Sequence, residues 1–333
     1  MASKSILALW LSYLSVSILT IYFVSSRQLS HSFEEKSLSQ SPVQYDNKFF
    51  CTFNSSTKTS STRRDVVLLF ATGYASGLEL CLKSLRSTGS QCTIVLFCSP
   101  DFHFTSYIER ILTGLDIEVV RDCKETKGRK IFVPHMIRFE FELDWLLKHR
   151  NSVDRVFHTD SFDVFFQGDP FANIQNDTLT FVVEPHQIRS CGWNLAWLRE
   201  CYGDQIMNSM GHRFIVCSGS VAGSSEHYIK LLKLMIDQNE WRTCYQPSKD
   251  QPILNYLIWN GLVEKAGIKY KLTGCDGGFF TVQWCVIEHT PLFNQHGQLV
   301  STMNTVPSYV HQYNRLKPLT NYLFDICKVK TRF

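Results

Sequence analysis

The sequence lacks several patterns that would assign a function directly. Its twelve cysteines include no CxxC pair, which argues against a zinc ribbon or a thioredoxin-like site. The small-residue stretch at residues 218–224 is not a GxGxxG fingerprint, and it has no P-loop lysine. The net charge is only +4 and no basic stripe stands out, so nucleic acid is not an expected partner.

The composition is that of a folded protein. A hydrophobic fraction of 44% in 333 residues is enough for a real core, in one large α/β domain or two small ones. No internal repeat and no second linker follow residue 65, which favours one domain over residues 65–333. Twelve cysteines fit an oxidising compartment in which some form disulfides, although the spacing leaves their pairing open.

The N-terminal segment indicates a membrane anchor. Lys4 precedes an apolar run at residues 6–24, and Arg27 follows it. This run is long enough to span a bilayer core of roughly 30 Å, so an uncleaved anchor is favoured over a signal peptide cleaved near Ser25. We expect a cytoplasmic tip and signal-anchor helix at residues 1–27. The protein would then be a single-pass type II protein of the Golgi or endoplasmic reticulum membrane, or a secreted one after cleavage.

Residues 28–64 are rich in Ser, Thr, Gln and charged side chains and lack the apolar residues to fold alone. We expect a flexible stem that holds the domain away from the membrane. Asn54 and Asn176 begin Asn-x-Ser/Thr sequons and are expected glycosylation sites. Both follow the anchor, which favours a lumenal position for the C-terminal part.

Strands that alternate with helices predict an α/β fold, a single Rossmann-like domain with a mostly parallel central sheet flanked by helices. Continuous apolar runs are typical of strands that are buried on both faces. We expect strands at 66–70, 93–97, 117–120, 153–159, 179–184, 214–217 and 282–287. We expect helices at 78–85, 133–149, 193–202, 228–236 and 248–257.

The chain is organised around Asp160 and Asp163. An apolar strand leads into this pair, and a second apolar run follows it, closed by a turn at Gly168-Asp169-Pro170. Asp is rarely buried unless it is paired or bound to a metal, and the carboxyl ends of strands are where open α/β sheets bind ligands. Two carboxylates there suit Mn²⁺ or Mg²⁺. The alternative is a turn or helix cap, a role that Asp often has.

Four further features are candidates for the same site. Arg138 lies near the start of a helix and either grips phosphate or covers apolar surface with its stem. Residues 218–224 allow a ligand close to the backbone, or simply connect a strand to a helix. Asp250 and Gln251 offer hydrogen-bonding groups to sugar hydroxyls, or cap their helix. His311 completes an Asp-Asp-His metal site, or is a hydrogen-bonded structural histidine.

In this order, residues 156–171, Cys217-Ser218-Gly219-Ser220, residues 250–255 and His311 resemble the GT-A-fold glycosyltransferases that use nucleotide sugars. The likeness is greatest to a poorly characterised eukaryotic group related to the glycogenin-like retaining transferases, and it covers roughly residues 65–320. Two spacings differ from that pattern. The carboxylates are arranged Asp-x-x-Asp, and His311 and Lys317 lie one residue further apart.

The resemblance implies a role for each matching residue. Asp160, Asp163 and His311 would hold the metal, with Asp160 also on the donor. Arg138, Ser218, Gly219 and Lys317 would contact the donor, and Ala71, Thr72, Gly73 and Tyr74 would receive its base. Asp250 and Gln251 would lie at the transferred sugar as catalytic residues.

The expected function is metal-dependent transfer of a sugar from a nucleotide-diphosphate donor to an acceptor hydroxyl, with retention of configuration. The acceptor would be a glycan, glycoprotein or glycolipid, recognised by loops at residues 187–210 and 274–283. A phosphatase with an aspartate nucleophile fits poorly, because it needs carboxylates two apart and position 162 is Phe. A non-catalytic glycan-binding or scaffolding module is the remaining alternative.

Overall fold

The computed structural model describes residues 44–73, 76–286, 291–301 and 303–330, which belong to one compact unit. The predicted tip and anchor at residues 1–27, and residues 28–43 of the predicted stem, lie outside the described residues. Within the described ranges, no helix is long and apolar enough to cross a membrane.

The centre of the fold is a seven-stranded sheet with the strand order β3-β2-β1-β4-β7-β6-β8. Four of its strand pairs are parallel, and β7 runs antiparallel to both of its neighbours. The predicted α/β class with a mostly parallel sheet is therefore confirmed. The strands are β1 (Asp65–Ala71), β2 (Thr93–Cys98), β3 (Ile117–Val120), β4 (Arg155–Thr159), β6 (Leu179–Gln187), β7 (Phe214–Ser224) and β8 (Tyr270–Thr273).

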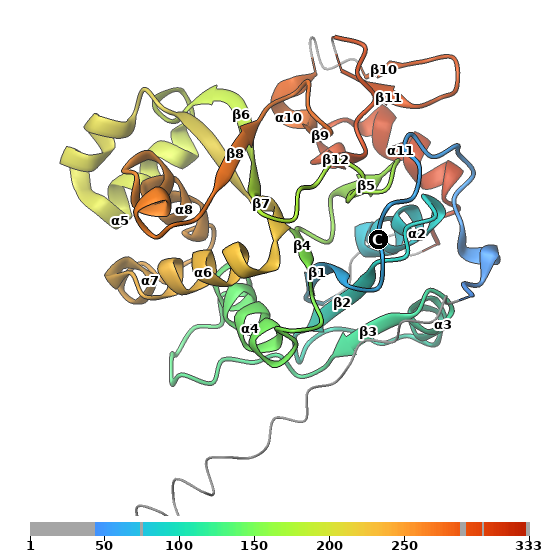
Figure 1. The fold of residues 1–333 in the computed structure, drawn as a ribbon, viewed down its shortest axis with the longest axis horizontal. Helices are drawn as coiled ribbons and strands as arrows, with labels where there is room; N and C mark the ends of the chain where they lie inside the picture. Colours follow the sequence, from blue (N-terminus) through green and yellow to red (C-terminus); the bar gives the residue numbers. More distant parts are fainter. Residues whose placement is uncertain (1–43, 74–75, 287–290, 302, 331–333) are drawn as a thin grey trace, which may run out of the picture. The chain divides into compact units, whose positions relative to one another are not determined.

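Helices pack on both faces of this sheet (Figure 1). One face is covered by α4 (Pro134–Lys148), α6 (Ser225–Ile236) and α8 (Asp250–Trp259), and the other by α2 (Ser76–Ser87) and α3 (Ser106–Gly114). The remaining helical segments are η1 (Asn47–Phe49), η2 (Ile188–Ser190), α5 (Gly192–Met210), α7 (Asn239–Thr243), α9 (Leu262–Lys265), α10 (Val282–Cys285), η4 (Tyr313–Arg315) and α11 (Lys317–Ile326).

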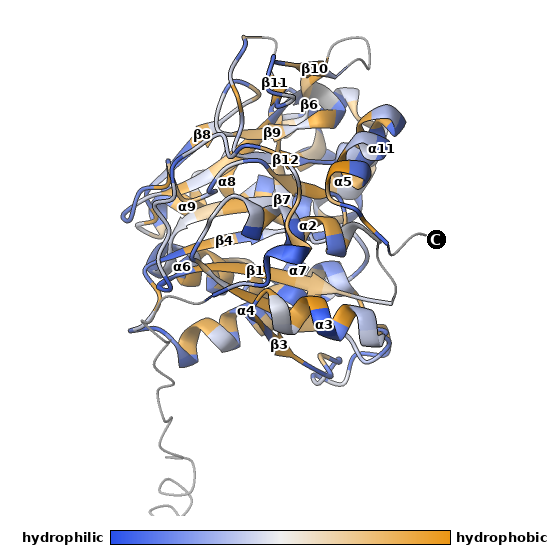
Figure 2. Ribbon diagram, turned by 90° about the vertical axis from the view of Figure 1, so that its right-hand side faces the viewer, coloured by the Kyte–Doolittle hydropathy of each residue, from blue (hydrophilic) through white to orange (hydrophobic). Residues whose placement is uncertain are grey.

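Strand β1 shows why its sequence is apolar at every position. Val66, Leu68 and Phe70 enter the core beneath α4 and α6, whereas Val67 and Leu69 enter the core beneath α2 and α3. A strand with two buried faces has no polar side to present. Figure 2 shows the same contrast, with central strands coloured as hydrophobic and α3 carrying both hydrophobic and hydrophilic residues.

Two small sheets complete the fold. Strands β5 (Val164–Phe166), β12 (Tyr309–His311) and β9 (Phe279–Thr281) form one, with β12 in the middle, and β10 (Leu292–Phe293) pairs with β11 (Leu299–Val300) in the other. The three-stranded sheet brings the C-terminal part of the chain next to the segment that follows β4. This pairing is what delivers His311 to the carboxylates described below.

Six of the twelve cysteines form disulfides, as expected for an oxidising compartment. The bonds are Cys51–Cys327, Cys201–Cys244 and Cys275–Cys285. The six free thiols are Cys81, Cys92, Cys98, Cys123, Cys191 and Cys217, and all but Cys191 are buried.

The described part of the predicted stem, residues 44–64, packs against the domain. Phe49 is buried in the core beneath α2 and α3, and Cys51 is bonded to Cys327. The buried Asp169 carboxylate accepts hydrogen bonds from the backbone N–H groups of Ser60 and Ser61, at 2.6 and 2.7 Å. The structure therefore differs from the expectation that the folded part begins at residue 65.

Two predicted elements are wrong. Residues 218–224, expected as a connection, are the second half of β7, where hydrogen bonds to β4 on one side and β6 on the other outweigh the low strand preference of small residues. Residues 282–285, expected as part of a strand at 282–287, form helix α10. The short strand β9 ends just before it, and the Cys275–Cys285 bond joins the two ends of this segment.

Candidate functional site

The loop between β4 and β5 carries Asp160 and Asp163 and is held by three hydrogen bonds, one between backbone groups and two from side-chain hydroxyls to backbone carbonyls. Asp160 N donates to Gly219 O at 3.1 Å, Ser161 Oγ donates to Phe70 O at 2.6 Å, and Tyr313 Oη donates to Phe162 O at 3.0 Å. These bonds satisfy the loop without using either carboxylate. The side chains of Asp160 and Asp163 are therefore free to point into a cavity.

His311 reaches this loop through strand pairing. In the antiparallel β12–β5 register it lies opposite Val164, the residue after Asp163. Its ring is buried, and Nδ1 faces Ser220 Oγ at 3.5 Å and Cys217 Sγ at 3.6 Å. The other ring nitrogen, Nε2, lies 3.2 Å from Asp160 Oδ2 and 3.6 Å from Asp163 Oδ1.

These three side chains fit a divalent cation. One ligand atom from each of Asp160, Asp163 and His311 lies within 4.8 Å of the other two. Neighbouring ligands of an octahedral ion with bonds of roughly 2.1 Å are roughly 3 Å apart, which is close to the two His311–carboxylate distances. Two carboxylate oxygens with one imidazole form a donor set that several divalent ions accept, so these residues do not by themselves identify the metal.

Gly219 gives the Asp160 carboxylate its space. A Cβ atom at position 219 would lie 2.4 Å from Asp160 Oδ2 and 2.8 Å from its Cγ. On the opposite side of the loop, Gly77 in the first turn of α2 allows Phe162 to approach, because a Cβ there would lie 1.5 Å from Phe162 O. The close approach of the backbone at Gly219 and at Gly77 therefore fixes the position of the Asp160 carboxylate.

Arg138 joins two of the acidic residues. Its guanidinium is buried and pairs with Asp160 Oδ1 through Nη1 and with Asp250 Oδ2 through Nη2, the latter at 3.0 Å. The alternative of a surface arginine that only covers apolar area is therefore wrong. The two carboxylate oxygens of Asp160 therefore have different partners, Arg138 at Oδ1 and His311 at Oδ2.

The charges around the site shift its pKa values in different directions. Burial alone would raise the pKa of Asp160, but Arg138 and His311 hold it below its ordinary value. Burial and the Asp160 charge raise the pKa of Asp163. Burial would lower the pKa of His311, but the groups around its ring, the Asp163 and Asp160 carboxylates among them, raise it well above the ordinary value. The imidazolium and a metal ion therefore compete for one position.

Helix α8 presents Asp250 and Gln251, and neither side chain caps it. Asp250 pairs with Arg138, while Gln251 accepts from Ser218 N at 3.2 Å and donates to Asn194 Oδ1 at 2.7 Å. Asn255, one turn further on, bonds to both backbone groups of Val216 in β7. The helix is thereby fixed to the strand that forms the wall of the cavity.

Two adjoining cavities open at this point, with volumes of about 230 and 290 Å³. They share walls made by His135, Arg138, Asp160 and Asp163. Together they fall in the range of roughly 300 to 1,000 Å³ that small-molecule sites occupy. The second lies at the carboxyl ends of the neighbouring strands β1 and β4, the point at which the strand order 3-2-1-4 reverses and α/β sheets bind ligands.

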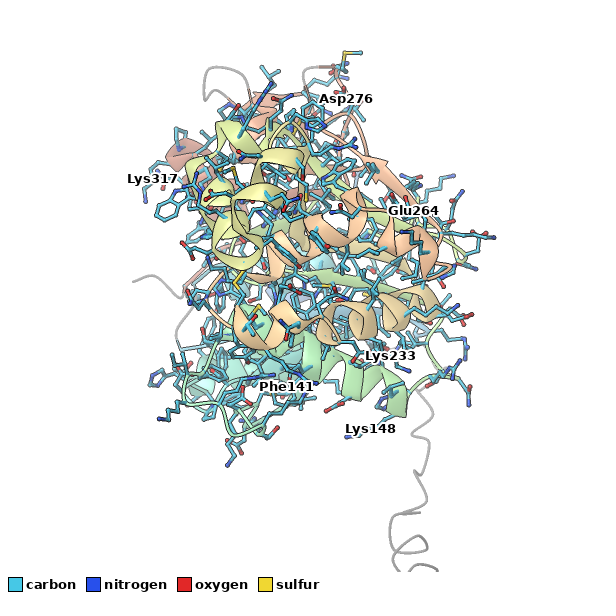
Figure 3. All side chains as sticks on the ribbon, turned by 90° about the vertical axis from the view of Figure 1, so that its left-hand side faces the viewer. Phe141, Lys148, Lys233, Glu264, Asp276 and Lys317 are labelled. Carbon is cyan, nitrogen blue, oxygen red and sulfur yellow. A yellow bond between two sulfur atoms is a disulfide. The ribbon has the colours of Figure 1, made fainter. Side chains whose placement is uncertain are left out.

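Most of the predicted site residues gather on these walls. Asp160, Asp163, His311, Arg138, Ser218, Gly219, Asp250 and Gln251 line the first cavity, and Thr72 lines the second. Ala71 and Gly73 line neither, and Tyr74 lies outside the described residues. Lys317 also lines neither, and it is exposed at the first position of α11, at the edge of the molecule in Figure 3.

Several wall residues were missed from the sequence. Arg315 lines the first cavity where Lys317 was expected to supply a cation, because η4 turns the chain between the two positions. His135, Glu184 and Gln312 also lie on the walls. Both segments predicted to contact an acceptor contribute residues: Cys191, Trp193, Asn194 and Trp197 from residues 187–210, and Gln283 from residues 274–283.

The two predicted glycosylation sites are accessible. Asn54 and Asn176 are both exposed, as attachment of a glycan requires. Glycosylation at these positions stays a prediction. In comparisons with known proteins, no protein-family model matches the chain and no curated sequence matches it.

Proposed function

We propose that the chain is a glycosyltransferase of the GT-A type, which uses a divalent cation to transfer a sugar from a nucleoside-diphosphate donor to an acceptor hydroxyl. One observation carries the proposal. Asp160 and His311, which are 151 residues apart in the chain, meet with Asp163 and Arg138 in a cavity at the reversal of the strand order. This position and this donor set suit a metal-bound diphosphate.

The charges of the cavity support a requirement for the cation. Its wall carries four carboxylates, from Asp160, Asp163, Glu184 and Asp250, against three positive groups, the two arginines and the His311 imidazolium. A wall with this excess of negative charge disfavours a diphosphate until a divalent ion is bound. We therefore expect the metal to bind before, or together with, the donor.

The protein's own groups then position and stabilise the reactants. A bound cation would supply positive charge to the diphosphate oxygens as the bond to the sugar breaks. Arg138, held by two carboxylates, lies beside this position, and Arg315 adds a second positive charge at the cavity. Asp250 can accept a hydrogen bond from a sugar hydroxyl, and the Gln251 amide can accept and donate.

The proposal also includes the stereochemistry of the transfer and the location of the domain. The anomeric configuration would be retained, as in the glycogenin-like enzymes that the sequence resembles. The three disulfides are in keeping with a domain in the lumen of the Golgi or endoplasmic reticulum. The apolar segment at residues 6–24 would anchor it there.

The test measures release of nucleoside diphosphate by the purified protein with a panel of nucleotide sugars. We expect hydrolysis of at least one donor with Mn²⁺ and none after chelation with EDTA. Asp160→Asn should abolish it, whereas Asp237→Asn, at an exposed carboxylate at the end of α6, should not. Proton NMR of the released sugar reports whether configuration is retained.

A glycan-binding module without catalysis gives a different result. It would bind saccharides but hydrolyse no nucleotide sugar at any metal concentration. Thermal shift adds a second readout, because a ligand that binds only the folded state raises the melting temperature. If donors alone stabilise the protein as much as donors with Mn²⁺, the proposed dependence on the metal is wrong.

A further inference from the structure

The first cavity is also lined by two tryptophans that the proposed donor site does not use. Trp193 and Trp197 lie one turn apart near the start of α5 and both line the cavity. Their ring centroids are 6.3 Å apart, with 37° between the ring planes. Trp193 is 73% exposed, more than any other large apolar side chain of the described residues.

Packing of the domain does not explain this arrangement. The Trp193 indole, which is 73% exposed, contributes little to the core and leaves a large apolar surface in water. Single exposed apolar residues are common on protein surfaces. Trp193 differs from these because its neighbour one turn on is also aromatic, and both line the cavity that contains the metal ligands.

The surroundings of the tryptophans point to a sugar ring. The same cavity wall carries the Asn194 and Gln283 amides and the Glu184 carboxylate. A pyranose has a face of C–H groups, which packs on an aromatic ring, and a rim of hydroxyls, which bonds to amides and carboxylates. A sugar ring would contact both the aromatic and the polar side chains of this wall, whereas a lipid chain would contact the aromatic ones alone.

Hydrogen bonds also link the helix that carries the tryptophans to residues of the proposed donor site. Asn194, between them in sequence, accepts a hydrogen bond from Gln251, which in turn holds Ser218 beside the metal site. The helix is fixed from behind, because Cys201 is bonded to Cys244 and the Tyr202 ring stacks on Tyr256 of α8 at 4.1 Å. The start of α5 is therefore fixed relative to the residues beside the candidate metal ligands.

We propose that Trp193 and Trp197 form an acceptor subsite for the terminal sugar ring of a glycan, so that the protein extends an existing carbohydrate. This inference rests on the proposed glycosyltransferase function and adds the class of acceptor to it. A glycoprotein or a glycolipid would be an acceptor through its sugar, and a bare peptide or lipid hydroxyl would not.

The experiment compares Trp193→Ala, Trp193→Phe and Phe214→Ala in the full chain. Phe214 is the matched control, because it is an exposed aromatic residue, 46% accessible, outside both cavities. Transfer is measured with methyl glycosides of common hexoses, pentoses and N-acetylhexosamines, and with a serine peptide and a long-chain alcohol. We expect transfer to glycosides alone.

The kinetic constants distinguish a stacking role from a structural one. Trp193→Ala should raise the acceptor KM by roughly tenfold or more with little change in the donor KM, Trp193→Phe should keep most of the acceptor affinity, and Phe214→Ala should change neither constant. Transfer to the peptide or alcohol, or an unchanged acceptor KM in Trp193→Ala, would overturn the subsite.

The subsite can be tested even if the protein hydrolyses no nucleotide sugar. If no donor is hydrolysed, the function is wrong, and the subsite is tested by quenching of tryptophan fluorescence with the same glycosides. Quenching in the wild type that disappears in Trp193→Ala supports the subsite in that case also. The absence of quenching overturns it.

Discussion

The position of one side chain, Asp160, depends on the absence of another at residue 219. Gly219 O accepts the backbone hydrogen bond of Asp160, and the space that a Cβ would fill holds the Asp160 carboxylate. The carboxylate is further divided between Arg138 and His311. A shift of one ångström at this point would therefore disturb the ion pair and the metal site together.

Gly219→Ala should weaken binding of Mn²⁺ by roughly tenfold to a hundredfold, because the new methyl group displaces Asp160 Oδ2. Isothermal titration calorimetry measures the affinity. Gly274→Ala is the control, since a Cβ at position 274 meets nothing within 4 Å. Equal affinity in the two variants would show that Asp160 Oδ2 is not a metal ligand.

Protonation of His311 should control metal affinity. Its raised pKa favours the imidazolium in the metal-free fold, and a metal ion needs the neutral ring. Its contribution to the stability of the metal-free protein is present below the unfolded pKa of about 6.5 and is lost as the pH rises through the folded pKa. Affinity for Mn²⁺ should therefore rise with pH, by up to about tenfold per unit below the folded pKa, because one proton is displaced.

Calorimetry in buffers of different ionisation enthalpy measures the proton that is released. The expected value is close to one proton per bound ion at the lower end of the pH range. Metal affinity that does not change with pH, or binding without release of a proton, would exclude His311 as a ligand. His296, which is exposed, is the control position, and His296→Gln should leave the pH dependence unchanged.

The sequence predicts the position of a charged side chain that follows an apolar strand. It does not predict the position of a side chain whose direction depends on a turn or on the start of a helix. Asp160 and Asp163 follow an apolar strand, so their placement at the sheet edge follows from the pattern. His311 was a candidate from its residue type and from the resemblance, but its approach to the carboxylates depends on the pairing of β12 with β5, which the sequence does not show. Arg315 and Trp193 carry no such signal, because the turn at η4 and the start of α5 decide which way they face.

At the scale of elements, helix α8 and strand β7 act as one unit. Asn255 donates to Val216 O and Gln251 O and accepts from Val216 N, all at 2.8–2.9 Å. These bonds join the strand that carries Ser218 and Gly219 to the helix that carries Asp250. The wall of the cavity is therefore stabilised by contacts that touch no ligand.

Asn255→Ala should lower the free energy of unfolding by about 2–4 kcal/mol, because it leaves buried backbone groups of Val216 without partners. Urea denaturation measures the change. The matched control is Asn260→Ala at the end of the same helix, where the amide bonds to Tyr256 O in an exposed position, and we expect less than about 1 kcal/mol. Similar losses in the two variants would contradict the proposed link.

The sequence predicts elements with a strong apolar pattern well. It does not predict elements that form only because they pair with neighbouring strands. The strand predicted at residues 117–120 matches β3, and the helix predicted at 133–149 matches α4 within one residue at each end. The second half of β7 is polar and small, and only its pairing with two strands makes it a strand. Residues 282–285 have an apolar pattern that fits either a strand or a short helix.

At the scale of the whole molecule, the Cys51–Cys327 bond joins the start and the end of the folded part across 276 residues. A disulfide restricts the unfolded chain more when it closes a longer loop. Cys275–Cys285 closes a loop with a separation of only ten. The two bonds should therefore differ in how much they stabilise the same domain.

Replacing Cys51 and Cys327 by serine should cost about 6 kcal/mol in the chain-entropy description, against about 3 kcal/mol for the pair Cys275 and Cys285. Denaturant unfolding of both double variants measures the difference. Equal losses of unfolding free energy would show that loop length does not determine how much these two disulfides stabilise the domain. The prediction of a flexible stem up to residue 64 missed this bond because spacing does not reveal cysteine pairing.

The same bond changes what a protease can do to this protein. A single cut at any peptide bond between residues 51 and 327 leaves two fragments that are still covalently linked. Nicked protein would therefore migrate as one band on a non-reducing gel and separate only after treatment with a reductant. After one cut in a surface loop between Asp163 and His311, the two parts of the candidate metal site would stay attached to one another.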